Sequence, residues 1–487
     1  MLNRRRLLTI GGLAGGALVI PAVRGITPDA GPAPRQAAAP HGHGVTNAAA
    51  AVKPAVTPFS VPMPLMPQAR PNARSSDTDF YSIPIQPGTA DILPGLSTPV
   101  LTYGGDFLAP MIRARTGRGV RAAFRNQLEH PTNIHLHGGH TRAAHDGHPM
   151  DLIAPGATRE YEYDNTQQGA SLWYHDHSHH TEAEHVYRGL AGFYVIDDPA
   201  ENYLGLPSGE FDVPIMLRDA QFDAKGGLVM IDPFAPSTLL ANGKPQPYFQ
   251  VAARKYRFRL LNAALEYTFA LNLDGVTVTQ VGSDGGLLSG PLTREKVTLT
   301  PGERVDIVVD FSRVPVGSQV VLSDDKGGAV LRFDVVRTAR DSSDLPPVLR
   351  QMPDTRSATT EREVVLSSQI SETSATGLIN GKPFDPERVD FRVRRGSTEI
   401  WRIVNGDGDF GFLHNLHTHL VHFRALDRDG APPTADDAGL KDTIAIPPGK
   451  SVRVRMTFPN QLGRYMFHCH FLAHSAIGMM AQMEVVA

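Results

Sequence analysis

The chain has 487 residues, and 47 Lys and Arg against 50 Asp and Glu give a formal net charge of −3. This near-balance excludes an argument from charge for binding nucleic acid or an acidic membrane surface. A hydrophobic content of 41% is typical of globular proteins, and the length is enough for about two to four domains. The single cysteine excludes an intramolecular disulfide.

The first 25 residues are predicted to be an export signal and not part of the fold. Three arginines, Arg4 to Arg6, precede a run rich in Gly, Ala and Leu that reaches about Ile20. A basic segment before a short apolar run is typical of a secretory signal, and adjacent arginines are typical of the twin-arginine type. The run is too short and too rich in glycine for a stable membrane span. We therefore expect an extracytoplasmic protein (periplasmic, cell-envelope or secreted) whose N-terminal signal is recognised by the export machinery.

Residues 26–75 are rich in Ala and Pro and show no periodic apolar pattern. This composition predicts a disordered linker between the signal and the first domain. His41 and His43 lie in this segment, and we expect no specific role for them.

A repeat of long period organises the rest of the chain. Pro-Gly turns followed by alternating apolar and polar residues occur three times, about 146 residues apart, at 155–156, 301–302 and 448–449. A second marker keeps the same order, because strand-like runs end at Asn126, Asn262 and Asn405.

The repeat predicts an all-β protein of three tandem Greek-key domains. We place domain 1 at 76–198, domain 2 at 206–338 and domain 3 at 361–487. Helical periodicity is weak, and only a short helix near 181–188 is expected.

Four short clusters carry most of the candidate metal ligands. Each holds two histidines two residues apart: His135 and His137, His175 and His177, His417 and His419, and His468 and His470. Alternate side chains of a strand point to the same face, so each pair offers two imidazoles on one side. Any one of these residues read alone is a buried structural histidine, but the recurring spacing favours metal ligands.

The last cluster contains the only cysteine. Cys469 lies between His468 and His470, so on a strand its thiol points to the face opposite to their imidazoles. With His414, His474 and Met479 it completes a set of one thiolate, two imidazoles and one thioether, which is the ligand set of a blue-copper site. One strand can therefore serve two metal centres.

At these clusters the sequence resembles the multicopper oxidases, a family that includes laccases, bilirubin oxidases and bacterial copper-efflux oxidases. The resemblance covers the chain after about residue 75 and implies cupredoxin-like domains with four copper ions: one type 1, one type 2 and two type 3. It implies type 1 ligation by His414, Cys469 and His474, with Met479 as axial ligand. It implies His135 and His417 as type 2 ligands. The other six histidines resemble the type 3 ligands: His137, His175, His177, His419, His468 and His470.

The resemblance implies an oxidoreductase that couples one-electron oxidation of a donor to four-electron reduction of dioxygen to water. Cys469 and its neighbours His468 and His470 join the two copper sites through single peptide bonds. Alignment of the copies puts Asp176 where Cys469 stands, so domain 1 is not expected to build a thiolate site. The matching part of domain 2 has no histidine, and we expect this domain to be a spacer that positions the outer two.

Two further positions concern the protons that water formation needs. Asp146 lies eleven residues after His135 and resembles the acidic residue near the type 2 copper in bacterial relatives, although an Asp-Gly turn before Gly147 explains it equally well. Ser475 stands where many bacterial relatives have a glutamate. We therefore hypothesise a slower or more pH-sensitive dioxygen step, unless another acid substitutes.

Several more histidines surround the clusters in domain 1. They are His140, His145, His148, His179, His180 and His185. An auxiliary copper site or a substrate-contact loop is one interpretation, and solvated loop residues are the other, which the usual surface preference of histidine favours. His130 and His422 are interpreted as structural.

The sequence leaves the electron donor open among three classes of function. A laccase-like oxidase would accept phenols or aromatic amines, whereas a cuprous oxidase would oxidise cuprous ion for copper tolerance. The 13 methionines are scattered and domain 3 shows no Met-rich insert, which favours the laccase-like interpretation. A copper-binding or cell-envelope scaffold without turnover is the third, disfavoured by the complete ligand set. The three-fold repeat argues against a two-domain nitrite reductase.

Overall fold

The computed structural model describes residues 51–231, 237–353, 357–371, 374–408 and 411–487. The predicted export signal and the first half of the predicted linker lie outside the described residues. In the described part of the chain, no helix is long and apolar enough to cross a bilayer.

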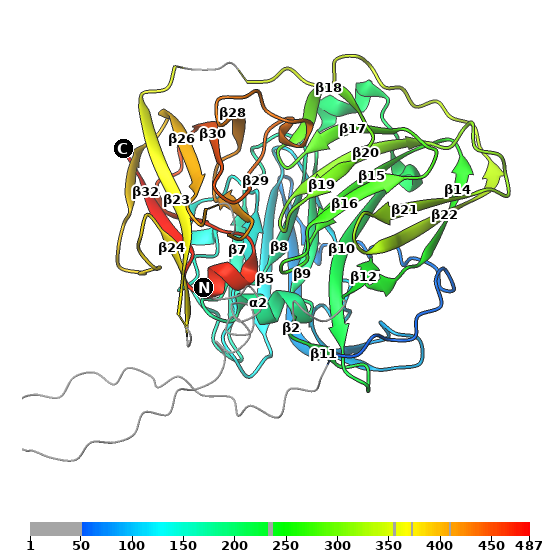
Figure 1. The fold of residues 1–487 in the computed structure, drawn as a ribbon, viewed down its shortest axis with the longest axis horizontal. Coiled ribbons are helices and arrows are strands. Elements are labelled where there is room, and N and C mark those ends of the chain that lie inside the picture. Colours follow the sequence, from blue (N-terminus) through cyan, green and yellow to red (C-terminus); the bar gives the residue numbers. More distant parts are fainter. Residues whose placement is uncertain (1–50, 232–236, 354–356, 372–373, 409–410) are drawn as a thin grey trace, which may run out of the picture.

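Within the described residues the strands form six sheets, and each sheet draws its strands from one third of the chain (Figure 1). The first third builds one sheet from β1 (Ala73–Arg74), β2 (Thr78–Ala90), β3 (Thr98–Tyr103), β5 (Gly119–Asn126) and β7 (Thr158–Tyr163). Its second sheet has the order β4 (Ile112–Arg115), β9 (Ala191–Asp197), β8 (Ala170–His175) and β6 (His135–His137).

The middle third is the largest of the three. Its first sheet contains β13 (Lys244–Pro245), β12 (Thr238–Ala241), β10 (Asp212–Phe222), β11 (Leu228–Val229), β15 (Lys255–Asn262), β20 (Arg304–Asp310), β17 (Val278–Ser283) and β18 (Gly286–Arg294). Its second sheet has the order β14 (Tyr248–Ala253), β22 (Gly328–Thr338), β21 (Gln319–Asp324), β16 (Phe269–Leu273) and β19 (Val297–Leu299).

The last third builds two five-stranded sheets. One has the order β24 (Ala375–Ile379), β23 (Thr360–Ile370), β26 (Thr398–Asn405), β30 (Ser451–Thr457) and β28 (Phe423–Arg428). The other has the order β25 (Phe391–Arg394), β32 (Met480–Val486), β31 (Gly463–His468), β27 (His414–Thr418) and β29 (Thr443–Ile446).

The same strand arrangement recurs in each third, as the sequence repeat predicts. The runs after the Pro-Gly turns become β7, β20 and β30, which pair antiparallel with β5, β15 and β26. The asparagine that ends each of these partner strands donates from its side chain to two backbone carbonyls: Asn126, Asn262 and Asn405. The all-β, three-fold architecture is confirmed, while the individual domain limits stay predictions.

Apolar side chains of the alternating strands fill a separate core in each domain. The core of domain 2 includes Phe258 and Phe333, and that of domain 3 includes Trp401 and Phe467, all nearly inaccessible to solvent. Burial of such rings contributes most of the stabilising free energy of each sandwich.

Two short helices lie beside one another at the boundary between domains 1 and 3. Helix α2 (Glu182–Arg188) matches the helix expected near 181–188 and contacts α3 (Leu472–Ala476), which had no predicted counterpart. Figure 1 shows α2 next to the red C-terminal helix, below the sheets of domain 3. Short 3₁₀ turns occur at Ala143–His145, Pro199–Leu204, Gly209–Phe211 and Ala435–Asp437.

Residues 51–75 differ from the disordered linker that their composition predicts. They run along domains 1 and 2 through bridges from Val52 to Phe222, from Pro62 to Tyr248 and from Gln68 to Met111. Met63 and Met66 are buried against these domains. Local composition missed this packing because the partners lie far along the chain.

Candidate metal centres

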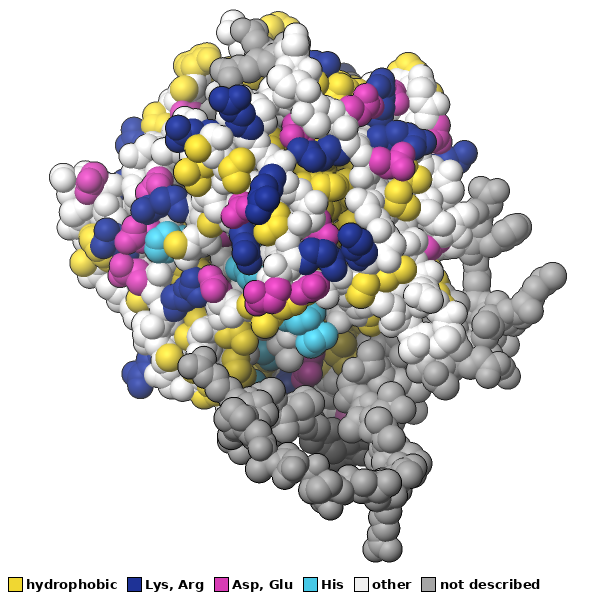
Figure 2. All heavy atoms as spheres, turned by 90° about the vertical axis from the view of Figure 1, so that its left-hand side faces the viewer, with side chains coloured by type: hydrophobic (Ala, Val, Ile, Leu, Met, Phe, Trp, Pro, Cys, Tyr) yellow, Lys and Arg dark blue, Asp and Glu magenta, His cyan; other side chains and the backbone are white. Residues whose placement is uncertain are grey.

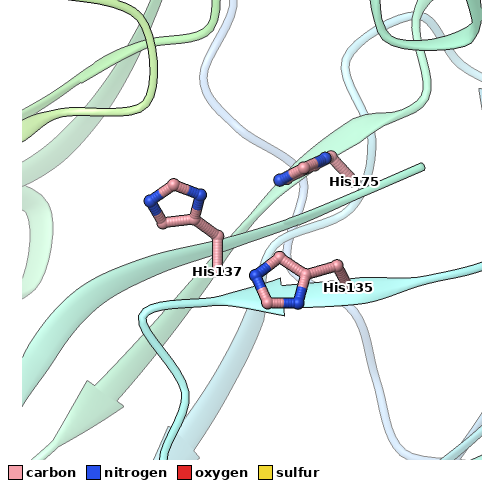
Figure 3. Close-up of side chains that lie close together, drawn as sticks. All are labelled: His135, His137 and His175. Atoms are coloured by element: carbon pink, nitrogen blue, oxygen red, sulfur yellow. The ribbon is translucent and has the colours of Figure 1, made fainter. Parts of the chain in front are cut away.

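Domain 1 contributes four buried imidazoles from two neighbouring strands. His135 and His137 lie on β6, whereas His175 ends β8 and His177 follows it. The two strands pair antiparallel with His135 opposite His175. Figure 3 shows the rings of His135, His137 and His175 pointing toward a common space.

Domain 3 contributes a matching set. His417 on β27 stands opposite His468 on β31, and His419 and His470 follow these strands. All four are at 0% exposure.

The structure brings the two sets together across the domain boundary. The rings of His135 and His419 stack with centroids 3.7 Å apart, and those of His137 and His417 stack at 3.6 Å. Nitrogen atoms within 4.8 Å of one another define three groups: His135, His137 and His175; His135, His417 and His419; and His177, His419 and His468. His470 joins the same cluster, with its ring 4.7 Å from that of His137.

Hydrogen bonds, and for His177 a close contact with Glu182, indicate which ring nitrogen of six histidines is free. Oxygen atoms lie 2.6 to 3.0 Å from Nδ1 of His135, His175, His177, His417, His419 and His468. These oxygens are carbonyls or carboxylates, so Nδ1 carries the proton and Nε2 keeps its lone pair.

The free Nε2 atoms face one another. His177 and His468 bring theirs within 3.1 Å, His419 and His468 within 3.4 Å, and His135 and His417 within 3.4 Å. Lone pairs at such distances repel each other unless a cation lies between them, and neutral imidazole is a common metal ligand.

Other ring nitrogens of the cluster are buried without a hydrogen-bond partner. These include Nε2 of His175, Nδ1 of His137 and both nitrogens of His470. His137 places Nε2 2.9 Å from Asp442, so its free nitrogen is Nδ1. Buried polar atoms without a partner destabilise a fold, and bound metal ions would satisfy them.

Burial keeps most of the cluster in the uncharged state that metal binding requires, whereas Glu182 outweighs burial at His177 and raises the pKa of that imidazole. Desolvation and the neighbouring imidazoles hold the pKa of His135, His419, His468 and His470 well below the ordinary value. Ligand protonation therefore competes little with a metal near neutral pH.

A second candidate centre surrounds Cys469. Its Sγ lies 3.9 Å from Nδ1 of His414 and 3.6 Å from Nδ1 of His474. Burial acts to raise the pKa of Cys469, but hydrogen bonds from both histidines outweigh it and lower the pKa to about 6. Asp407 binds Nε2 of His414 at 2.9 Å and leaves Nδ1 facing the sulfur.

Met479 is buried beside this centre. Its carbonyl accepts from the amide of Cys469, and its own amide donates to His474. Thiolate, two imidazoles and a neighbouring thioether form the donor set that suits copper.

Asp146 lies against the histidine cluster. Its Oδ2 is 2.6 Å from Nδ1 of His419, its carbonyl accepts from His135, and Thr141 donates to its Oδ1. Burial raises the pKa of Asp146 to about 7. Gly147 follows with a φ of 78°, so the predicted turn is present as well and presents the carboxylate to the cluster.

Sequence reasoning missed a carboxylate that reaches the cluster from α2. Glu182 is 1% exposed and lies 2.9 Å from Nδ1 of His177. It also accepts a hydrogen bond from the hydroxyl of Ser475. The contact joins residues 293 positions apart, and no local pattern in the sequence points to it.

Domain 2 also approaches the cluster, which adds direct contacts to its expected role as a spacer that positions the outer two domains. The fully buried guanidinium of Arg304 forms an ion pair with Asp442, which in turn contacts His137. A Cβ added to Gly302 would lie 3.0 Å from the ring of His470. The second Pro-Gly turn therefore packs directly on the histidines, and the glycine permits this approach.

The additional histidines are mostly not solvated loop residues. His185 is buried and pairs with Asp176 at 3.2 Å, and His148 binds Gln482 at 3.0 Å. His179 and His180 stack with centroids 3.6 Å apart, and only His180 is exposed. The structure brings none of these four into the groups of candidate metal ligands.

The remaining histidines have separate places. His140 and His422 form a pair with Nε2 and Nδ1 3.2 Å apart, and His145 lies 4.0 Å from Glu162. His130 interacts with other residues of the fold, and its backbone carbonyl accepts from Asn126.

Comparison with known proteins agrees with this geometry. Family models described as multicopper oxidase match residues 84–201, 214–325 and 351–487. A laccase of Bacillus stratosphericus is 32% identical over 87% of this chain and 98% of its own length. A bilirubin oxidase of Albifimbria verrucaria is 34% identical over 89% of this chain and 82% of its own.

A solved structure shares the fold. The laccase of Pediococcus acidilactici superposes with a TM-score of 0.81 at 30% identity, covering 89% of this chain and 97% of the laccase. This likeness confirms the expected cupredoxin-like Greek-key domains. The chain therefore belongs to the multicopper oxidase family, whose members use copper ions to oxidise a reducing substrate with dioxygen.

Proposed function

We propose that the protein is a laccase-like oxidase with four copper ions. Type 1 copper is assigned to His414, Cys469 and His474 with Met479 as axial ligand. Type 2 copper is assigned to His135 and His417. The type 3 pair is assigned to the six remaining histidines: His137, His175, His177, His419, His468 and His470. The observation that carries this proposal is the set of facing, unprotonated Nε2 atoms beside a cysteine with a lowered pKa.

Copper at these positions supplies one-electron oxidation of the donor and four-electron reduction of dioxygen to water. The chain itself holds the centres at a fixed separation, because His468, Cys469 and His470 are consecutive and fully buried. Asn415 fastens this segment by accepting from the amide of His470 at 2.7 Å. Asp407 and Glu182 orient His414 and His177 by binding the nitrogen that faces away from the centre.

Asp146 is proposed to supply protons to the reaction. A pKa of about 7 keeps its carboxyl partly protonated near neutral pH, and its Oδ2 touches a ligand imidazole. Proton transfer is most effective when the pKa of the donor lies near the working pH.

Phenols and aromatic amines are the proposed donors. Support comes from relatives named laccase and bilirubin oxidase and from the scattered methionines. His474 is partly exposed, so an electron from a donor at the surface has a short path to the sulfur centre. Cuprous ion is the alternative donor. Export through a twin-arginine-type signal, to a place outside the cytoplasm, is part of the same proposal.

Oxygen uptake by copper-loaded protein tests the proposal. Dimethoxyphenol and cuprous ion are supplied in parallel, and electrons per dioxygen and released peroxide are measured. We expect four electrons per dioxygen, no peroxide, and the larger rate per concentration with dimethoxyphenol. A larger rate with cuprous ion would favour the copper-tolerance function. No uptake from either donor at full copper loading would leave only a copper-binding or cell-envelope scaffold.

A further inference from the structure

A cavity of about 330 Å³ lies where the three domains meet. Its lining comes from domain 1 (His140 and Gln167), from domain 2 (Gly285) and from domain 3 (His422 and Arg455). Arg350, in the segment between domains 2 and 3, also lines it. The volume lies within the range of small-molecule pockets, roughly 300–1,000 Å³. None of the residues assigned to copper lines this cavity, so the inference below is independent of the copper assignments.

The lining is basic. Among the residues that the structure describes, Arg350, Arg424 and Arg455 line the cavity and no aspartate or glutamate does. Among the described residues, no salt bridge joins any of the three guanidinium groups to a carboxylate. Guanidinium groups stay charged at all ordinary pH values, so the described lining carries three positive charges.

Two of the arginines are placed directly opposite each other. Arg424 on β28 and Arg455 on β30 are register partners in an antiparallel pair. Like charges directly opposite on neighbouring strands destabilise a sheet. An anion bound between the two side chains would remove this repulsion.

Buried donors also lack partners. Nε of Arg350 and Nε of Arg455 are buried without a hydrogen bond. One other nitrogen of Arg350 donates to the carbonyl of Gly285 at 2.7 Å, which holds the side chain at the cavity. Unsatisfied buried donors of this kind destabilise a fold unless a ligand accepts from them.

Part of the remaining wall is apolar, although His140, Gln167 and Thr457 also line it. Met352, Leu440 and Pro459 line the cavity together with the arginines. Inorganic anions gain nothing from such a surface, whereas an organic anion would bury its hydrocarbon part there. The carboxylates of Asp198 and Glu201 act on Arg350 electrostatically, but they line a neighbouring pocket and not this cavity.

We propose that this cavity is a binding site for a small organic carboxylate with an apolar body. The carboxylate lies between Arg455 and Arg424 and also accepts from Arg350, and the apolar body rests on Met352 and Leu440. Arginine is suited to this role because its planar donors match the two oxygens of a carboxylate.

Calorimetric titration of the copper-loaded protein with three probes tests the proposal. Benzoate carries both the charge and the apolar body, benzyl alcohol lacks the charge, and sulfate lacks the apolar body. We expect benzoate to bind at least about tenfold more tightly than either of the others, as the loss of one charge-assisted contact predicts. Equal binding of benzyl alcohol, tighter binding of sulfate, or no binding of benzoate would each overturn the proposal.

Variants locate the bound benzoate. We expect Arg455→Gln and Arg424→Gln each to weaken benzoate binding about tenfold. Arg424 is exposed, so its variant keeps the test valid if Arg455→Gln does not fold. Arg125→Gln removes an exposed arginine from β5 in domain 1 and is the matched control, with unchanged binding. Unchanged binding in the folded cavity variants would place benzoate elsewhere, for example on copper, and overturn the assignment.

Discussion

Domains 1 and 3 use the same local structure for two different purposes. In each, a strand that ends in a histidine, β8 or β31, is followed by one residue, a second histidine and a short helix. The residue between the histidines is Asp176 in domain 1 and Cys469 in domain 3. Both are fully buried, and both face a histidine from the helix that follows, His185 or His474.

The two solutions differ in how the buried negative charge is compensated. Asp176 accepts hydrogen bonds from Thr132 and from the backbone and hydroxyl of Ser178, and pairs with His185. The protein alone satisfies this carboxylate. Cys469 instead lies between two imidazoles whose Nδ1 atoms are only 3.1 Å apart. We propose that a copper ion completes that arrangement, so the comparison sets a structural ion pair against a proposed metal site.

The largest effect is expected from Cys469→Ser. Serine keeps the size of the side chain but removes the thiolate, so the blue-copper absorption and the oxidation of dimethoxyphenol should both be abolished. Oxygen uptake and the visible spectrum of copper-loaded protein measure this. The eight histidines remain, so we expect copper at the other centre to be retained.

Asp176→Cys is the mirror test. It creates a cysteine between two histidines in domain 1, but His185 is its only additional imidazole. We expect no second blue-copper absorption. The appearance of such a band would show that the motif alone is enough and would contradict the comparison.

The second effect concerns the ion pair in domain 1. Burial acts to lower the pKa of His185, but Asp176 outweighs it and raises the pKa. Burial acts to raise the pKa of Asp176, but His185 and the hydrogen bonds lower it to about 2. His185→Gln leaves a buried carboxylate without its partner and should lower the free energy of unfolding by about 3 kcal/mol.

The pH dependence of this loss has a defined sign. The contribution of Asp176 is present above its unfolded value of 3.8 and is lost as the pH falls toward 2. The contribution of His185 is fully present below 6.5 and is lost as the pH rises through its raised folded pKa. The difference between His185→Gln and the parent in guanidinium unfolding should therefore be largest near pH 5 and shrink at alkaline pH.

His145→Gln is the control for this measurement. His145 is also a domain 1 histidine beside a carboxylate, but its partner Glu162 is 4.0 Å away and partly exposed. We expect a change below about 0.5 kcal/mol. A similar loss in both variants would refute the special role of the buried pair.

Much of the fold and of both centres could be predicted because their signals are local. Alternation of apolar and polar residues predicts the strands β7, β20 and β30. Two histidines spaced two residues apart place both imidazoles on one face of a strand. Alignment of the repeats also predicted that Asp176 in domain 1 occupies the position equivalent to Cys469 in domain 3. Each of these depends on neighbours within a few residues.

Contacts between distant segments could not be predicted in the same way. Arg304 forms a hydrogen bond with Asp442, which lies 138 residues away in the sequence. Glu182 forms one with Ser475, which lies 293 residues away. The sequence around Arg304 or Glu182 shows no pattern that indicates which residue it contacts. Both contacts arise only when complete domains pack, which also explains why residues 51–75 were mistaken for a free linker.

The third effect tests the carboxylate that α2 brings to the cluster. Glu182→Gln removes the charge that binds Nδ1 of His177 at 2.9 Å. Outer partners of metal-bound histidines fix the ring, so we expect turnover or copper retention to fall by about tenfold. Dialysis against a chelator and oxygen uptake measure the two quantities.

Glu184→Gln is the matched control for that change. Glu184 lies on the same helix, 52% exposed, and pairs only with Arg188. Its variant should keep the parent turnover. Equal losses in Glu182→Gln and Glu184→Gln would assign the effect to the helix and not to the contact with His177.

The smallest effect is expected at Ser475, where the family resemblance implies a glutamate and this chain has a serine. Its hydroxyl donates to Glu182, so domain 1 supplies a carboxylate at this point, and we propose that this carboxylate substitutes for the expected glutamate. Ser475→Ala should lower turnover only by roughly threefold, the effect of one hydrogen bond. Ser475→Glu would place a second buried carboxylate against Glu182, and because like charges repel at short range we expect no gain in turnover at any pH. A faster and less pH-dependent Ser475→Glu variant would show instead that the missing glutamate limits the dioxygen step and that Glu182 does not replace it.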